Sequence, residues 1–189
     1  VNAIVGLHAT GGSTNHTLHL PAMAAAAGIT LTWQDFADLS EVTPLLARVY
    51  PNGQADVNHF HAAGGMGYVI AELLGAGLLD GSAATVSGDS LADYAREPVL
   101  SDNGLVWRDA PSTSLDTDIL RPAGDPHAPN GGLRMLDGNL GKAVIKISAV
   151  AEERRLIEAP AAVFEEEAAV KAAYVAGELD RDVVVVVRG

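Results

Sequence analysis

The sequence predicts an α/β fold, and two features of the chain carry that prediction. Hydrophobic residues make up 48% of the 189 residues and aromatic residues only 5%, with Ala, Gly, Leu and Val abundant. Small aliphatic side chains suit closely packed layers of helices and strands better than an all-β sandwich. In addition, short apolar runs alternate with a helical pattern in a regular β/α rhythm after residue 132.

The chain is organised around a glycine-rich turn, Gly-Gly-Ser-Thr, at residues 11–14. Gly11 and Gly12 permit positive φ and let a ligand approach the backbone. Ser13 is a suitable N-cap for the apolar, Ala-rich helix expected over 14–27. The free N–H groups of such a helix start favour an anion such as phosphate or carboxylate. A helix start without a ligand explains the same pattern, and local sequence alone favours that interpretation.

Pro21 interrupts this helix and is expected either to kink it or to start a second helix. Capping residues and glycines mark the elements that follow. Thr32 is expected to cap the next helix, with Asp35 in its first turn. The elements expected before residue 98 are helices over 33–39 and 66–76, a strand over 84–87, and a short helix to about Arg96 that Asp89 or Ser90 caps.

Residues 98–132 hold five of the nine prolines and many Asp, Ser and Thr residues, so we expect them to connect two domains. The five consecutive valines near the end of the chain predict a fully buried strand. The elements expected after the connection are strands over 133–136 and 142–149, an extended segment over 158–164, a helix over 165–176 that stops at Gly177, and the valine strand over 183–187.

Composition excludes several classes of function. The net charge is −12, and residues 1–100 contain only two cations, so the chain has no basic patch for nucleic acid. No apolar stretch approaches the roughly 20 residues of a membrane span. The sequence contains no Cys, which excludes disulfides and cysteine-ligated clusters within the chain and fits a cytoplasmic protein. The first residues do not resemble a signal peptide, and both ends look abrupt, so we expect a segment of a longer polypeptide.

Histidines are the candidate metal ligands. His16 and His19 share a helix face, but no carboxylate follows at the spacing of a zinc protease, so hydrogen-bonded structural histidines are favoured. His59 and His61 share a face only if their segment is extended, and a structural or substrate-contacting role is favoured there as well. The sequence contains no nucleophile elbow, P-loop or dinucleotide fingerprint.

Four runs in order resemble the dihydroxy-acid dehydratase / phosphogluconate dehydratase family. They are His8-Ala-Thr-Gly-Gly-Ser-Thr-Asn-His-Thr-Leu-His-Leu20, Asp56-Val-Asn-His-Phe-His-Ala-Ala-Gly-Gly-Met66, Gly131-Gly-Leu-Arg-Met-Leu-Asp-Gly-Asn-Leu-Gly141 and Ala143-Val-Ile-Lys-Ile-Ser-Ala-Val150. The second run and residues 115–122 resemble the 6-phosphogluconate dehydratase branch more closely. The resemblance implies the end of an α/β N-terminal domain over 1–97, a Pro/Gly-rich linker over 98–130, and the start of a swivelling β/β/α C-terminal domain over 131–189.

The resemblance also implies a hydro-lyase. Its branch removes water from 6-phospho-D-gluconate to give 2-keto-3-deoxy-6-phosphogluconate, the entry to the Entner–Doudoroff route of gluconate metabolism. Family members use an iron–sulfur cluster, here expected to be 4Fe-4S, often with Mg²⁺ or Mn²⁺, metals that can neutralise the developing enolate and the departing oxygen. The cluster cysteines are missing from this chain, and the other metal ligands and the base proposed in relatives fall outside it. We therefore expect no catalytic or metal-ligating residue here, an inactive isolated chain, and a full-length homodimer that depends on the rest of the polypeptide.

The resemblance makes Gly11, Gly12, Ser13, Thr14 and Asn15 candidates for substrate binding, with the phosphate or carboxylate, or the cluster, facing the helix start. Two further candidates for contacts to substrate hydroxyls are His8 and His61. The turn could instead pack against the cluster-bearing part. Two other functions remain open: a dehydratase of a branched-chain dihydroxy acid or an unphosphorylated sugar acid, and a non-catalytic module that binds small anions.

Overall fold

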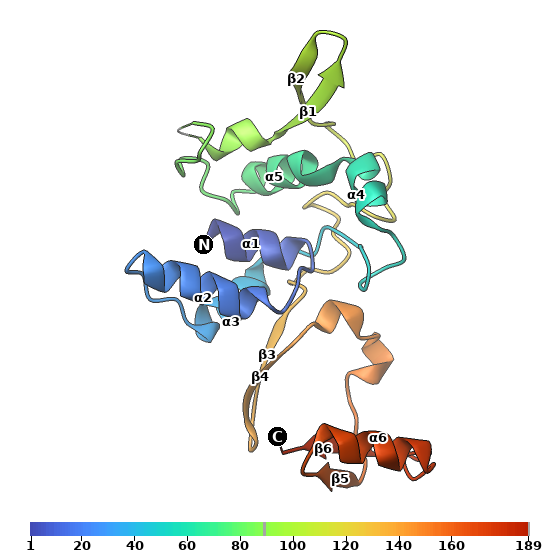
Figure 1. Cartoon of the computed structure of the whole chain (residues 1–189). Coiled ribbons are helices and arrows are strands. Elements are labelled where there is room, and N and C mark those ends of the chain that lie inside the picture. Colours follow the sequence, from blue (N-terminus) through green and yellow to red (C-terminus); the bar gives the residue numbers. More distant parts are fainter. Residues whose placement is uncertain (89, 189) are drawn as a thin grey trace. The chain divides into compact units, whose positions relative to one another are not determined.

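A computed structural model of the chain describes residues 1–88 and 90–188 (Figure 1). The chain forms two compact units, Val1–Ala149 and Val150–Gly189, and each is described here by itself. Asp89, one of the two residues expected to cap the short helix before Arg96, lies outside the described residues. Its neighbour Ser90 does cap that element, because its hydroxyl accepts the N–H of Ala92 at 3.1 Å.

The first unit is mainly helical. The helices predicted from sequence are confirmed to within a few residues, except that the helix over His16–Ala26 continues through Pro21, which was expected to interrupt it. The two helices beginning at Asn2 and Val57 were not predicted. The helical elements of this unit are α1 (Asn2–Ala9), α2 (His16–Ala26), α3 (Trp33–Val42), α4 (Val57–Ala63), α5 (Gly65–Gly75), and the short 3₁₀ turns η1 (Leu91–Tyr94) and η2 (Ile147–Ala149).

Side-chain caps begin two of these helices, α3 and α4. At α3, Thr32 and Asp35 form the expected capping box, in which the N–H of Thr32 donates to Oδ2 of Asp35 at 2.7 Å. At α4, Asp56 accepts the N–H groups of Asn58 and His59. The segment that carries His59 and His61 is therefore helical, and two residues that are two apart on a helix do not share a face. By contrast, α1 begins without any side-chain cap.

Two hairpins complete the first unit. One pairs β1 (Arg96–Ser101) with β2 (Gly104–Asp109), and the other pairs β3 (Arg134–Gly138) with β4 (Gly141–Ile145), both antiparallel. The β3 and β4 strands confirm the strands expected after residue 132, although residues 147–149 turn into η2. Residues 84–87 form a turn with a single bridge from Thr85 to Gly88, so the strand expected there is wrong, since so short a segment finds no partner strand.

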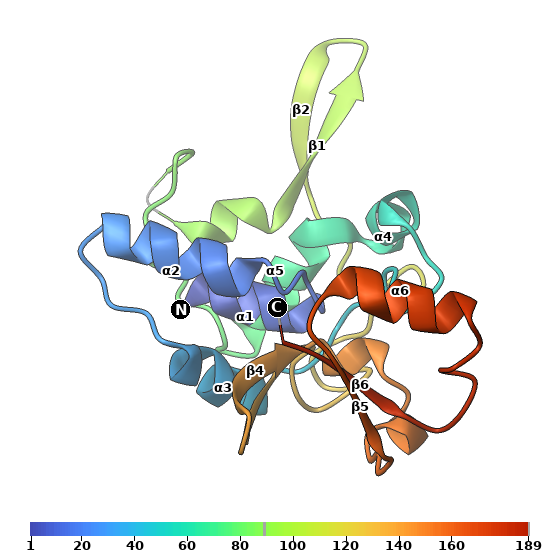
Figure 2. The ribbon, with the colours of Figure 1, turned by 60° about the horizontal axis from the view of Figure 1, so that its bottom comes forward.

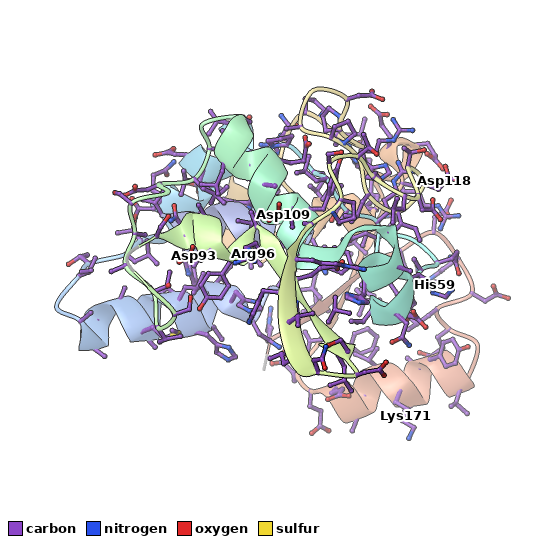
Figure 3. The ribbon with its side chains drawn as sticks, turned by 90° about the horizontal axis from the view of Figure 1, so that it is seen from above. His59, Asp93, Arg96, Asp109, Asp118 and Lys171 are labelled. Atoms are coloured by element: carbon purple, nitrogen blue, oxygen red, sulfur yellow. The ribbon has the colours of Figure 1, made fainter. Side chains whose placement is uncertain are left out.

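The stretch expected as a linker is partly ordered. Arg96 and Asp109 approach to 3.6 Å across the base of the β1–β2 hairpin, where both are labelled in Figure 3. Further along, Leu120 is fully buried in the core of the first unit. Residues 98–130 therefore contain ordered structure, because residues 96–101 pair with residues 104–109 and later apolar residues are buried. The domain division itself stays a prediction.

Two apolar clusters form the core of the first unit. The larger joins α1 and α5 to the extended segment after α3, and the smaller joins α1 and α3 to the residue just before β3. The members of the larger cluster are Val5, Ala9, Leu46, Ala47, Ala63, Tyr68, Val69, Leu73, Ile119 and Leu120, and those of the smaller are Ile4, Leu7, Phe36 and Leu133. Residues from the middle and from the later part of the unit thus pack on α1.

The second unit is a small β-α-β arrangement. It contains the 3₁₀ turn η3 (Glu152–Arg154) and the parallel strands β5 (Ala161–Phe164) and β6 (Val184–Val187), joined through α6 (Glu167–Val175) (Figure 2). These elements confirm the predicted β/α rhythm. The prediction of a fully buried valine strand is wrong in this chain, since Val184 is 38% exposed and Val187 is 46% exposed. One neighbouring strand and one helix cannot cover both of its faces.

No helix among residues 1–88 and 90–188 has the length and apolar character needed to cross a membrane.

Candidate functional site

The glycine-rich turn ends α1 before it leads into α2. The N–H of Gly11 donates to the carbonyl of His8 at 3.2 Å, and the N–H of Gly12 donates to the carbonyl of Leu7 at 2.9 Å. With Gly11 at φ 57°, these two bonds form the closing pattern of a helix C-terminus that requires a left-handed residue. The sequence was interpreted as a turn that feeds the following helix, and the structure adds that the glycines first stop a helix that was not predicted.

Side chains from two distant segments hold this turn. The carbonyl of Gly11 accepts a hydrogen bond from Nδ2 of Asn52 at 2.9 Å and another from Nζ of Lys146 at 2.8 Å. The hydroxyl of Ser148 lies 2.8 Å from Oδ1 of Asn52 and donates to it, which fixes the orientation of that amide. Gly132 approaches so closely that a Cβ there would lie 2.6 Å from Cα of Gly11. The turn is therefore held in one conformation by residues far along the chain.

A cavity of about 640 Å³ opens beside the turn. The glycine-rich turn supplies polar backbone and hydroxyl groups, and the other lining residues come mainly from α4, α5 and the extended segment after α3. The lining residues are Thr10, Gly11, Gly12, Ser13, Thr14, Ala47, Val49, Tyr50, Pro51, Val57, Phe60, Met66 and Lys146. Cavities of a few hundred cubic ångströms with apolar walls and few polar groups are typical of small-molecule sites.

Four of the candidate residues, Gly11 to Thr14, line this cavity together. Ser13 was expected to cap α2, and this prediction is wrong in detail: Asn15 is the N-cap, and Oγ of Ser13 accepts the N–H of Asn15 at 3.2 Å. The N–H groups of His16 and Thr17 already donate to carbonyls of the turn. Within the described chain, however, the N–H groups of Ser13 and Thr14 donate to no acceptor.

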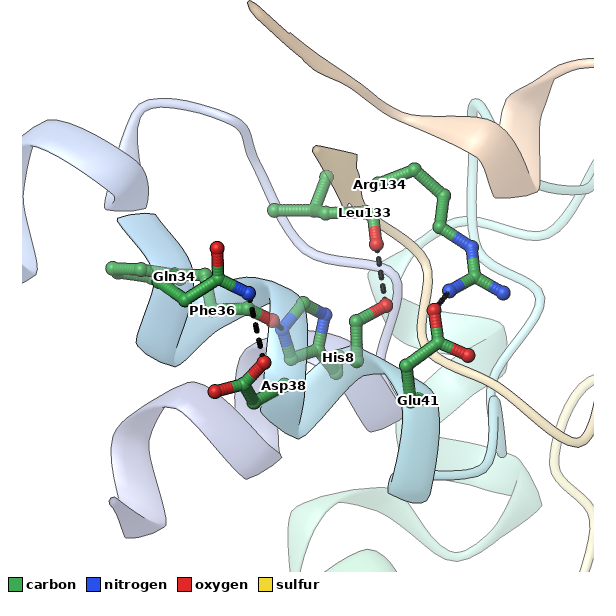
Figure 4. Close-up of polar contacts among 8 residues, drawn as sticks. His8, Gln34, Phe36, Asp38, Glu41, Leu133 and Arg134 are labelled. Atoms are coloured by element: carbon green, nitrogen blue, oxygen red, sulfur yellow. Dashed lines mark hydrogen bonds and ion pairs between the residues drawn. The ribbon is translucent and has the colours of Figure 1, made fainter. Parts of the chain in front are cut away.

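His8 lies outside the cavity, in the interior of the unit. Its ring is fully buried, and Nε2 lies 2.9 Å from the carbonyl of Phe36, to which it donates (Figure 4). Burial lowers the pKa of His8, and the charge of Arg134 lowers it further, so the ring is neutral at pH 7. A Cβ at Gly131 would come within 2.7 Å of the ring, which shows how closely the backbone packs against it.

The other histidines and Asn15 also lie outside the lining of the cavity. His61 is exposed on α4. His16 and His19 form an edge-on pair with ring centroids 6.1 Å apart, and Nδ1 of His16 lies 3.1 Å from the carbonyl of Ser13. Within residues 1–88 and 90–188, no group of three or more His, Cys, Asp or Glu side chains could hold a metal ion.

Lys146 and Asn52 are the site residues that the sequence analysis missed. Lys146 is the one charged residue that lines the cavity among the described residues, and burial lowers its pKa. A signal for it was present: a cation stands between Ile145 and Ile147 in the middle of the strand predicted over 142–149. Asn52 lies in the Pro-Asn-Gly turn and gave no such signal, because only the folded chain brings it to Gly11.

Comparison with known families accounts for most of the chain. Residues 1–94 match the model described as dihydroxy-acid/6-phosphogluconate dehydratase N-terminal, and residues 118–189 match the corresponding C-terminal model. The chain therefore belongs to the dihydroxy-acid/6-phosphogluconate dehydratase family, which confirms the resemblance seen in its four sequence runs. Because Gly11 lies in the first match and Lys146 in the second, residues of both matches build the cavity.

Individual relatives place the chain more finely. It is 58% identical to the phosphogluconate dehydratase of Pseudomonas aeruginosa and 60% identical to that of Rhizobium meliloti, in both cases over 100% of this chain and 31% of the relative. It is 39% identical to the dihydroxy-acid dehydratase of Nitratidesulfovibrio vulgaris over 99% of this chain and 32% of that relative. The chain thus spans about a third of the length of the relatives it matches.

Proposed function

We propose that this chain is part of a hydro-lyase that dehydrates 6-phospho-D-gluconate to 2-keto-3-deoxy-6-phosphogluconate. The observation that carries the proposal is the difference in identity between the two kinds of relative, near 60% for phosphogluconate dehydratases against 39% for a dihydroxy-acid dehydratase. A cytoplasmic location and a homodimeric full-length enzyme belong to the same proposal.

In this proposal, the cavity beside the glycine-rich turn is part of the substrate site. Its polar wall offers the N–H groups of Ser13 and Thr14, and glycines at 11 and 12 leave room for a ligand against the backbone. The rim carries exposed apolar side chains, with Tyr50 77% exposed and Val57 73% exposed. Exposed apolar groups beside a polar site are typical of a surface that a ligand or another part of a protein covers. Binding and orientation of the sugar acid are the tasks that these residues can perform.

The family resemblance implies an iron–sulfur cluster and a divalent cation, but the residues of this chain do not fit either group. The chain has no Cys, and the part that the structure describes has no cluster of side chains suited to a metal ion. We therefore assign no proton transfer or elimination step to the chain, and we propose that the rest of the full-length protein supplies the groups that perform them.

The test begins with the native protein. Its mass, measured with an antibody against this segment, should be severalfold above 19.5 kDa. The purified native protein should convert 6-phosphogluconate to a 2-keto acid, detected with a carbonyl reagent, faster than it converts gluconate or a branched-chain dihydroxy acid. The isolated 189-residue chain should convert none of them. A native mass near that of the chain, or preferred turnover of an unphosphorylated acid, would contradict the proposal.

Variants of the turn test the assignment of the site. In the native full-length protein, Ser13→Ala and Thr14→Val should raise KM or lower kcat by about 10-fold each, the effect of one lost hydrogen bond in a polar site. The matched control is Ser82→Ala, which removes a hydroxyl from an exposed turn outside the cavity. Kinetics equal to wild type for both variants would remove the hydroxyls of Ser13 and Thr14 from the site and leave only their backbone N–H groups as donors.

A further inference from the structure

The cavity contains a cation that no acidic side chain neutralises. Lys146 lies directly after β4, and its Nζ donates to the carbonyl of Gly11, which leaves two of the three N–H donors of the ammonium for other acceptors. No ion pair joins Lys146 to an Asp or Glu in the described chain, and no other lining residue of the cavity is charged. The other described lysine of this hairpin, Lys142, lies 3.8 Å from the carboxylate of Asp137.

A partly buried ammonium without an anion is unfavourable, because it has lost part of its hydration and has gained only a neutral carbonyl in exchange. Burial accordingly lowers the pKa of Lys146. The chain has twice as many acidic as basic side chains and a net charge of −12, so a cation without an acidic partner is unusual in it. A ligand with an anionic oxygen group would restore the missing partner and form short, charge-assisted hydrogen bonds.

We propose that Lys146 is the anion-binding residue of this cavity and that it binds a phosphate or carboxylate group of the ligand. The unpaired N–H groups of Ser13 and Thr14 line the same cavity and supply further donors for such a group. The identification of the ligand as a phosphorylated sugar acid rests on the proposed function, whereas the binding of an oxyanion rests on the geometry of Lys146 alone.

Lys146 could instead serve only to hold the turn, and Asn52 allows the two roles to be separated. Because Nδ2 of Asn52 donates to the same carbonyl, the turn keeps one side-chain anchor when Lys146 is replaced. Lys146→Gln removes the positive charge but retains an amide that can donate to Gly11. Lys146→Arg retains the charge. Lys142→Gln is the matched control, since it removes the same charge from β4, just before Lys146 in the chain and outside the cavity.

The experiment measures dissociation constants by titration calorimetry on the native full-length protein, with inorganic phosphate, D-gluconate and 6-phosphogluconate as ligands. Lys146→Gln should weaken binding of 6-phosphogluconate by about 10- to 100-fold, the effect expected for one charge-assisted hydrogen bond. Lys146→Arg should recover part of that loss, and Lys142→Gln should bind as wild type. Melting temperatures of the variants identify any that fail to fold.

Two ligands identify which anionic group is bound. If Lys146 binds the phosphate group, Lys146→Gln weakens the binding of inorganic phosphate and leaves the binding of gluconate unchanged. If Lys146 binds the carboxylate group, the variant weakens the binding of gluconate and leaves the binding of inorganic phosphate unchanged. Binding of all three ligands by Lys146→Gln as tightly as by wild type would overturn the inference, as would a wild-type protein that binds none of them. Loss of anion binding in a protein without dehydratase activity would refute the proposed function and leave this inference standing.

Discussion

Replacement of Gly11 by alanine probes the conformation on which the whole site depends. Gly11 has φ 57°, and a Cβ added there would lie 2.1 Å from Nδ2 of Asn52 and 3.2 Å from Cδ1 of Leu45. The left-handed backbone costs an alanine about 1–2 kcal/mol. Displacing the Asn52 amide from the Gly11 carbonyl costs about 1 kcal/mol more. Gly11→Ala should therefore destabilise the turn by about 2–3 kcal/mol.

Gly6→Ala is the matched control, because Gly6 lies within α1 and a Cβ there would meet nothing within 4 Å. Alanine in a helix interior is favoured over glycine by roughly 0.5–1 kcal/mol, so this variant should stabilise α1. Amide hydrogen exchange of the native protein, read by mass spectrometry on peptides from α1 and the turn, measures both effects locally. Gly11→Ala should exchange about 30- to 150-fold faster than wild type and Gly6→Ala more slowly. Exchange that changes in the same direction for both variants would refute the reasoning.

Two further predictions concern stability. Because burial lowers the pKa of His8, only the unfolded chain binds a proton as the pH falls through the ordinary histidine value of 6.5, so stability is full above that value and declines below it. In His8→Gln the new amide can still donate to the Phe36 carbonyl, and the melting temperature should fall less steeply below about pH 7. Some dependence on pH should remain, because burial also lowers the pKa of His127. A slope equal to that of wild type would count against this account of His8. Leu120→Ala, at a fully buried position, should lower the free energy of unfolding by about 2–5 kcal/mol, measured with denaturant. Leu100→Ala, at a position 84% exposed, should lower it by less than about 0.5 kcal/mol. Similar decreases for the two variants would contradict the assigned core.

The elements that sequence predicted well are those with local signals. The capping box formed by Thr32 and Asp35 predicted α3, and Gly177 predicted the end of α6. The first helix was missed because its clearest signal, the left-handed glycine that ends it, was assigned to the next helix. A glycine pair between two helices fits both assignments equally well until both helices are known.

The sequence predicted the part of the site that is contiguous in the chain and missed the part that comes from a distant segment. Four consecutive residues, Gly11 to Thr14, line the cavity as the turn pattern suggested. Their cationic partner comes from 135 residues away, and no local pattern joins Lys146 to Gly11. His8 shows the opposite limit: its place next to the turn in sequence suggested a ligand contact, but α1 directs its ring into the core, toward Phe36.

The two side chains that donate to the Gly11 carbonyl, those of Asn52 and Lys146, are synthesised at different times. A ribosome adds about 5–20 residues per second. Asn52, 41 residues after Gly11, is therefore synthesised about 2–8 s after Gly11, whereas Lys146, 135 residues after Gly11, is synthesised about 7–27 s after it. During that interval Ile4 and Leu7 lack Leu133, the residue that completes their cluster. Phe36 of the same cluster is synthesised much earlier, so the nascent chain carries an apolar helix face that is only partly covered for many seconds. Transiently exposed apolar surface of this kind is what chaperones bind.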